Sequence, residues 1–423
     1  MVKWLLIWKV PELRRKVLFV LAILAVFRVV AAVPIAGVDK EQLAAFFSQS
    51  QLFGLLGLFT GSTLENLSVV MLGVGPYITA TIILQLLTMI FPRLKEIYYE
   101  EGEQGRQRFN QYGRILTVPL AALNGFGFLR LLQSQQVLSA LDPLTLLTDI
   151  AIVTAGTVFL MWLGELISEK GIGNGVSLII FAGIVSSIPA AISRTLQTWD
   201  PAQLPQVVIF SAIALAVIAA VVLINEGQRR IPVAYAKRVR GTKMYGGVST
   251  HLPVRVNSAG VIPIIFALSI LLFPGMIASF FSAAEAESVA KIATAIQNLF
   301  SQTSTLYAFL YFFFVFTFTY FYTAVVFDPK EVSQNIQRAG GFIPGIRPGE
   351  PTAQYLSRII SRTTLIGAVF LGVIAVLPQI VQQSLGLATL TVGGTAVLIV
   401  VSVVLETVRQ IDAQLTMREY ENI

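Results

Sequence analysis

Few residues of this chain have the side-chain chemistry of a catalyst or a metal ligand. There is no cysteine, which excludes a disulfide, a thiolate nucleophile and a cysteine-ligated metal, and there is a single histidine, His251. A lone histidine in a polar segment usually has a structural role, and it cannot build a histidine-rich metal site. The sequence also lacks a Gly-x-Ser-x-Gly elbow, a His-Glu-x-x-His motif, a phosphate-binding loop and paired carboxylates within an apolar run. We therefore expect no enzyme activity, no cofactor and no metal.

Two short motifs contain glycines at spacings that bind ligands in other proteins. The run Gly-Ile-Gly-Asn-Gly at 171–175 follows an expected helix rather than a strand, whereas a dinucleotide site needs a strand, a turn and a helix in that order. We interpret this run as a tight turn between two helices. The segment 71–77 faintly resembles a potassium-channel filter, but it contains Pro76 and occurs once, so we treat the likeness as a coincidence.

Basic residues gather in two long polar segments. Residues 227–257 contain seven Lys or Arg and no Asp or Glu, and apolar residues alternate with polar ones at both ends, which predicts a basic β-hairpin with a turn at 240–242. Residues 328–362 contain Gly340-Gly341, Pro344-Gly345 and Pro348-Gly349, which predict a turn-rich loop that presents Arg347. Either segment could bind an anionic partner, or its charge could serve only to orient the chain in a membrane. The sequence leaves both interpretations open.

The composition indicates that long apolar helices must position the two basic segments. The chain has 423 residues, of which 55% are hydrophobic and only 13% are charged, whereas soluble domains carry about 25% charged residues. A membrane span needs about 20 mostly apolar residues. Ten runs meet this requirement, at 17–36, 69–91, 115–133, 149–168, 174–193, 206–225, 258–280, 306–327, 363–382 and 388–408. The first run is longer than the apolar region of a signal peptide, about 7–15 residues, and contains Arg28, so we expect it to be retained as a helix.

The basic residues divide unequally between the two sides of the membrane that ten spans define. Twenty-five of the 30 Lys and Arg lie on the side of the N-terminus, and three lie opposite, namely Lys40, Arg194 and Lys291. The positive-inside rule then places both termini in the cytoplasm. The acidic residues Glu165, Glu226 and Glu406 lie near cytoplasmic ends, so no carboxylate at mid-span could couple transport to protons or sodium. Residues 54–68 are glycine-rich and too short to span, and fit either a short helix beside a cavity or an outer loop.

Several short sequence motifs, in the same order along nearly the whole chain, resemble those of the SecY/Sec61-alpha family of protein-translocating channels. They are Phe27-Arg28 with Pro34-Ile35 and Gly37, Gly75-Pro76-Tyr77-Ile78, Gln85-Leu86-Leu87, Met161-Trp162-Leu163-Gly164-Glu165, Gly171-Ile172-Gly173-Asn174-Gly175, Gly227-Gln228-Arg229-Arg230, Tyr235-Ala236-Lys237-Arg238, Ser249-Thr250-His251-Leu252-Pro253, Gly260-Val261-Ile262-Pro263, Pro344-Gly345-Ile346-Arg347-Pro348-Gly349 and Gly393-Gly394-Thr395.

The resemblance implies an all-α polytopic membrane protein. Its ten transmembrane helices would form two pseudo-symmetric inverted halves, residues 1–193 and 194–423, around a central hourglass pore. The segment at about 54–68 would be a plug, with Gly61, Ser62, Thr63, Leu64, Glu65 and Asn66 at its centre. A constriction ring would consist of Val74, Ile78, Leu178, Ile265 and Ile399. Val74 and Ile78 are four residues apart and hence on one helix face, and a ring of branched apolar side chains dewets and resists ions.

The resemblance also implies a lateral gate between spans two and three and spans seven and eight. Its residues would be Pro76, Gln85, Pro263 and Ser269. We expect the prolines, and Pro274 in the same helix as Pro263, to permit kinking, and the polar side chains to hold the gate shut by weak hydrogen bonds. The basic loops would dock the motor ATPase SecA or ribosomal RNA through Arg229, Arg230, Lys237, Arg238, Lys243 and Arg347.

The function that follows from the resemblance is a protein-conducting channel. Such a channel moves unfolded secretory polypeptides across the bacterial plasma membrane and releases transmembrane segments sideways into the phospholipid bilayer. Its expected partners are the small membrane subunits SecE and SecG, SecA and the ribosome. The alternative is a secondary transporter of a small solute with an inverted-repeat fold, which would need an ionisable site at mid-membrane.

Overall fold

The computed structural model describes most of the chain. The described residues are 10–35, 67–99, 101–134, 138, 142–197, 204–235, 238–240, 243–245, 249–281, 287–300, 304–385 and 394–421. The chain forms two compact units, and each is treated by itself. The first comprises Met1–Leu204, Phe273–Ser304 and Leu387–Ile423, and the second comprises Pro205–Leu272 and Thr305–Gly386. This grouping by contact differs from the division at residue 193, which stays a prediction.

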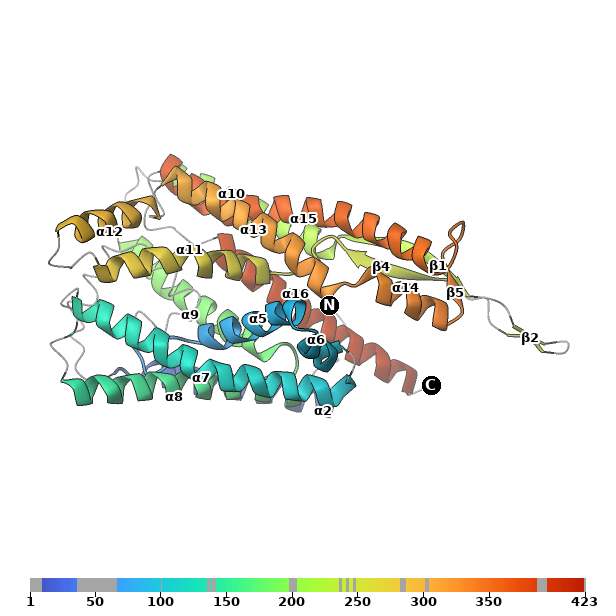
Figure 1. The fold of residues 1–423 in the computed structure, drawn as a ribbon, viewed down its shortest axis with the longest axis horizontal. Coiled ribbons are helices and arrows are strands. Elements are labelled where there is room, and N and C mark those ends of the chain that lie inside the picture. The colour runs from blue at the N-terminus through green and yellow to red at the C-terminus, as the bar shows by residue number, and fades with distance from the viewer. Residues whose placement is uncertain are drawn as a thin grey trace. The chain divides into compact units, whose positions relative to one another are not determined.

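Helices make up most of the described part of the first unit (Figure 1). They are α2 (Pro11–Ala31), α5 (Gly75–Ile90), α6 (Pro92–Tyr99), α7 (Gly102–Ser134), α8 (Pro143–Lys170), α9 (Gly175–Gln197), α12 (Glu287–Leu299) and α16 (Gly394–Glu421). Helix α11 (Ile262–Phe281) contributes its second half to this unit. Helices α7 and α8 pack along one another, as do α5 and α7, and α9 packs on both α8 and α16.

The second unit combines long helices with short strands. Its helices are α10 (Leu204–Glu226, of which all but the first residue lies in this unit), the first half of α11, α13 (Thr305–Val326), α14 (Pro329–Arg338) and α15 (Glu350–Leu385). Its strands are β1 (Gln228–Tyr235), β2 (Arg238–Arg240), β3 (Lys243–Tyr245), β4 (Ser249–Arg255) and β5 (Gly341–Phe342). Helices α13 and α15 pack along one another, and α14 packs on α15 and β5 (Figure 1).

A helix covers most of the described part of each of the ten apolar runs, and the prediction of a helical membrane protein is confirmed. Three of these helices, α7, α15 and α16, continue well beyond the apolar run into charged sequence. Among the described residues, four helices are long and apolar enough to cross a membrane, and the bent pair of α5 and α6 would be a fifth. The number of ten spans therefore stays a prediction.

The core of the first unit surrounds an irregular segment, residues 67–74, that precedes α5. Leu67, Met71 and Leu72 are buried in a cluster with apolar residues of α7 and α8. The segment is tied to the end of α2 because Ile35 N donates to the Leu67 carbonyl at 2.9 Å and Val69 N donates to that of Val33 at 3.0 Å. Irregular backbone is tolerated in a membrane protein where other parts of the protein shield it, which is the situation here.

Candidate functional site

Four of the five residues predicted to line the pore lie in the first unit. Val74 is the residue before α5 and is 1% exposed, and Ile78 lies one turn later, its N–H donating to the Val74 carbonyl at 3.0 Å. Their predicted position on one helix face is therefore confirmed. Leu178 in α9 and Ile399 in α16 are both buried, and these two helices contact each other. Ile265, in α11, belongs to the second unit. The closed ring of five stays a prediction.

The glycine run at 171–175 forms the turn between α8 and α9, as the sequence predicts. Gly173 has a φ of +93°, which favours glycine, and its N–H donates to Gln410 Oε1 on α16 at 2.7 Å. A Cβ at Gly175 would overlap the carbonyl oxygen of Gly164, so only glycine allows α9 to begin against α8. The run therefore fixes three helices, one of which carries Leu178, and has a structural role.

Two of the prolines predicted to kink the helices of the lateral gate lie instead in the first turn of their helices. Pro76 occupies the first turn of α5, and Pro263 is the second residue of α11. In the first turn of a helix the backbone N–H has no intrahelical acceptor, so a proline there begins the helix and does not kink it. The expectation that these two prolines permit kinking is wrong, whereas Pro274 does lie inside α11.

The two polar gate residues are less fully described than the prolines. Gln85 is partly buried in α5, and Ser269 lies in α11, its side chain outside the described part of the structure. Their role in a gate stays a prediction. The plug residues 61–66 lie outside the described residues altogether.

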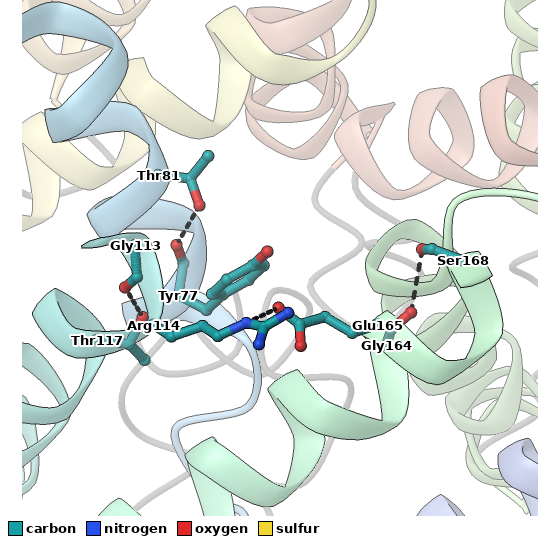
Figure 2. Close-up of polar contacts among 8 residues, drawn as sticks. All are labelled: Tyr77, Thr81, Gly113, Arg114, Thr117, Gly164, Glu165 and Ser168. Carbon is teal, nitrogen blue, oxygen red and sulfur yellow. Dashed lines mark hydrogen bonds and ion pairs between the residues drawn. The ribbon is translucent and has the colours of Figure 1, made fainter. Parts of the chain in front are cut away.

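An ion pair joins two helices of the first unit, α7 and α8 (Figure 2). Arg114 Nε donates to Glu165 Oε1 at 2.8 Å, and the two side chains are 48% and 21% exposed. Tyr77, on α5, lies beside the pair (Figure 2), and its phenol is close enough to interact electrostatically with both Arg114 and Glu165. The neighbouring hydroxyl groups are occupied within their own helices, since Thr81 donates to the Tyr77 carbonyl and Thr117 to that of Gly113.

The sequence analysis did not pair Arg114 with Glu165, which are 51 residues apart. The available signal was that opposite charges stand at the predicted cytoplasmic ends of consecutive spans. Antiparallel neighbouring helices bring such ends to the same level, but only the folded structure shows which of the charges meet.

The basic hairpin forms, and it belongs to a larger folded module. Strands β1 and β4 pair antiparallel with Ile231 opposite Leu252 and Arg229 opposite Val254, and β2 pairs with β3. The predicted alternation is confirmed, since Ile231 and Val233 are 1% and 2% exposed. The turn at 241–242 lies outside the described residues.

The second polar segment joins the same sheet, which the sequence analysis missed. Strand β5 pairs with the other edge of β1, opposite Ala234 and Tyr235, and the strand order is β4-β1-β5. A two-residue strand carries no periodicity from which pairing can be inferred. We call the assembly of β1, β4, β5, α14 and the loop 343–349 the loop module. Its core joins apolar residues from both polar segments and from the start of α15, namely Ile231, Val254, Ile343, Leu356, Ile359 and Ile360.

The loop module holds Arg347 on an ordered support. The Arg347 carbonyl accepts from Thr352 Oγ1 at 2.8 Å, and buried Ser333 of α14 donates its hydroxyl to the Gly349 carbonyl at 2.7 Å. Gly345 and Gly349 have φ angles of +81° and +97°, which lets the chain turn sharply on either side of Arg347. The Arg347 side chain is exposed. The prediction of a turn-rich loop that presents this arginine holds for residues 339–349, whereas most of the predicted range 328–362 is helical, in α14 and the start of α15.

The remaining predicted docking residues are only partly described. Arg229 and Arg230 are exposed on β1. Arg238 and Lys243 begin β2 and β3, with side chains outside the described part, and Lys237 lies outside it altogether. Within the described ranges, no group of three His, Cys, Asp or Glu side chains comes together as a metal site would require.

Long apolar helices, shielded irregular backbone and a basic module of strands and loops define a multi-pass helical membrane protein. Solved structures with similar folds include a protein-conducting channel (TM-score 0.64, 21% identity, covering 93% of this chain and 90% of that one). Another is canine Sec61 in a ribosome–channel complex from the endoplasmic reticulum (TM-score 0.61, 20% identity, covering 93% and 90%).

The SecY family model matches residues 68–408. Relatives described as protein translocase subunit SecY include that of Streptomyces scabiei, which is 42% identical over 98% of this chain and 97% of its own length. That of Thermus thermophilus is 42% identical over 98% and 95%. The chain therefore belongs to the SecY family.

Proposed function

We propose that the protein is the channel subunit of a protein translocase. It would conduct unfolded secretory polypeptides across the membrane and release apolar segments sideways into lipid. The observation that carries this proposal is the family match over 68–408 together with 42% identity, over nearly the whole of both chains, to proteins described as translocase subunits. A small-solute transporter is not favoured, because these relatives cover the chain from end to end.

The proposed conduction path is the predicted ring of Val74, Ile78, Leu178, Ile265 and Ile399, closed from outside by the plug at 54–68. Supporting this, Val74 and Ile78 share a helix face at the start of α5, just after a segment of irregular backbone that the protein shields. Branched apolar side chains can part around a polypeptide without selecting its sequence, and when closed they form a neck that dewets. We place the lateral gate at spans two, three, seven and eight, as the family resemblance implies.

The loop module is proposed as the docking surface for the partners that drive transport. Its exposed Arg229, Arg230 and Arg347 would contact either SecA or the phosphates of ribosomal RNA. We further propose that the small subunits SecE and SecG accompany the chain, and that it resides in the bacterial plasma membrane with both termini in the cytoplasm. This orientation is supported by the distribution of Lys and Arg: with ten spans, 25 lie on the side of the N-terminus and three lie on the opposite side.

The conduction path can be tested by crosslinking, since the chain has no cysteine of its own. A cysteine at Ile78 should crosslink to a secretory polypeptide stalled in transit, whereas a matched cysteine at Leu215, which is 67% exposed on α10, should not. A stalled polypeptide that crosslinks to neither, or equally to both, would refute the proposed path. A cysteine at Thr63 tests the plug in the same way.

The docking proposal is tested by reversing single charges. Arg347→Glu should abolish most SecA-driven transport, whereas Arg338→Glu, at the exposed end of α14 in the same module, should have a much smaller effect. Equal losses in the two variants would point to a general charge effect and would remove Arg347 from the docking surface.

A further inference from the structure

Helices α7 and α8 pack along one another, and the polar link between them lies where α5 packs on α7 and α9 packs on α8. Arg114 immediately follows Gly113, and a Cβ at Gly113 would stand 3.7 Å from Leu84 Cδ1 and 3.9 Å from Thr81 Oγ1, both on α5. These are ordinary van der Waals distances, so α7 lies in direct contact with α5 at this position. These two helices therefore form a close-packed pair.

The acidic partner has a corresponding position in the other pair of helices. Glu165 immediately follows Gly164, at which a Cβ would stand only 3.1 Å from Val176 Cγ2 on α9. The start of α9 is also fixed by Ser168, whose hydroxyl donates to the Gly164 carbonyl at 3.0 Å and accepts from Gly175 N at 2.9 Å. Helices α8 and α9 therefore form a second close-packed pair.

The first pair carries Val74 and Ile78, and the second carries Leu178. Tyr77, which lies beside the ion pair, is the residue before Ile78 (Figure 2). We propose that the Arg114–Glu165 ion pair is an electrostatic clasp that sets the spacing between these two helix pairs and keeps the constriction narrow at rest. The inference rests on the proposed channel function and adds two positioning residues to it.

The exposure of the pair suits a contact that opens and closes. Arg114 is 48% exposed and Glu165 is 21% exposed, so water can replace the contact at moderate cost, whereas a fully buried pair would be hard to separate. Loss of one such charge shifts an equilibrium between two conformations by up to about fivefold. The clasp therefore biases the channel toward its narrow state without locking it.

The test is the resting ion current of the purified channel, with its partner subunits, in a planar lipid bilayer. Arg114→Gln and Glu165→Gln should each raise the current by up to about fivefold. The double exchange Arg114→Glu with Glu165→Arg should return it to within about twofold of the original, because it restores the opposite charges. The matched control is Arg108→Gln, which removes the exposed Arg108–Glu101 pair at 3.3 Å and should leave the current unchanged.

Two results would overturn the clasp: a current in Arg114→Gln equal to that in Arg108→Gln, or no recovery in a double exchange that melts at the original temperature. If the double exchange is unstable, Arg114→Lys serves instead, since it retains the charge and should retain a low current. Transport of an unfolded secretory polypeptide by the unaltered channel is measured in the same preparation. Failure of that transport refutes the channel function, whereas normal transport with an unchanged current in Arg114→Gln refutes only the clasp.

Discussion

A single methyl group at Gly156 should disturb the segment that positions Val74. Gly156 lies in α8 directly against the backbone of residue 69, and a Cβ there would overlap the carbonyl oxygen of Val69. The same Cβ would stand 2.9 Å from the Val69 carbonyl carbon and 3.2 Å from Val70 Cγ1. Because the nearest atoms are backbone, they cannot move aside as the end of a flexible side chain could.

The expected cost follows from how that segment is held. Relief of the overlap requires a backbone shift of roughly 1 Å, and overpacking of this kind costs about 1–3 kcal/mol. The shift would also strain the bond from Val69 N to the Val33 carbonyl. Alanine gains about 0.5–1 kcal/mol over glycine within a helix, which offsets part of this cost. We therefore expect Gly156→Ala to lower the free energy of unfolding by up to about 2.5 kcal/mol, and by about 1 kcal/mol in the middle of this range.

The measurements are the melting temperature of the purified protein and its resting ion current. A fall of a few degrees should accompany a raised current, because the displaced segment leads into Val74. The matched control is Gly125→Ala in α7, where a Cβ would meet only Val153 Cγ1 at 3.6 Å and Leu72 Cδ1 at 3.9 Å, which are ordinary contacts. That variant should melt at or slightly above the original temperature. If Gly156→Ala and Gly125→Ala behave alike, the reasoning from the close contact is wrong.

Three further predictions concern the constriction and the loop module. Replacing Ile78 by serine should raise the resting ion current, because a polar side chain wets the neck; a current equal to that of the original would count against the ring. Ile231→Ala should destabilise the loop module by about 2–4 kcal/mol, since Ile231 is 1% exposed in its core, and limited proteolysis within 227–257 should be faster. Ser333→Ala should cost about 1 kcal/mol through the lost bond to the Gly349 carbonyl and should speed cleavage near Arg347, whereas cleavage at the unaltered rate would show that this bond does not order the loop.

Local sequence was sufficient wherever a structural property depends on neighbouring residues. The helical positions of the apolar runs, the alternation of Ile231 and Val233 in a strand, and the common helix face of Val74 and Ile78 were all predicted. Each depends on a period of two or 3.6 residues that is legible in a single stretch of chain. The turn at 171–175 was predicted for the same reason, from glycines that follow one helix and precede another.

Predictions were wrong where the effect of a residue depends on the exact start of a helix. They were missing where it depends on contact with a segment that is distant in the chain. Pro76 and Pro263 were expected to kink α5 and α11, but each is the second residue of its helix, where a proline favours helix initiation. The pairing of β5 with β1 was missed because two residues show no pattern. The contact of Arg114 with Glu165 joins residues that are far apart in the chain and that no local rule relates.

The sequence by itself determined that this is a helical membrane protein with a strongly asymmetric distribution of basic residues, because apolar length and charge placement are properties of composition and order. Only the tertiary structure decided that the two polar segments form one module, that Gly156 must be small, and that an ion pair links α7 to α8. These features arise where distant segments come within a few ångströms of each other. That closeness depends on how the helices pack together, and no single stretch of sequence contains it.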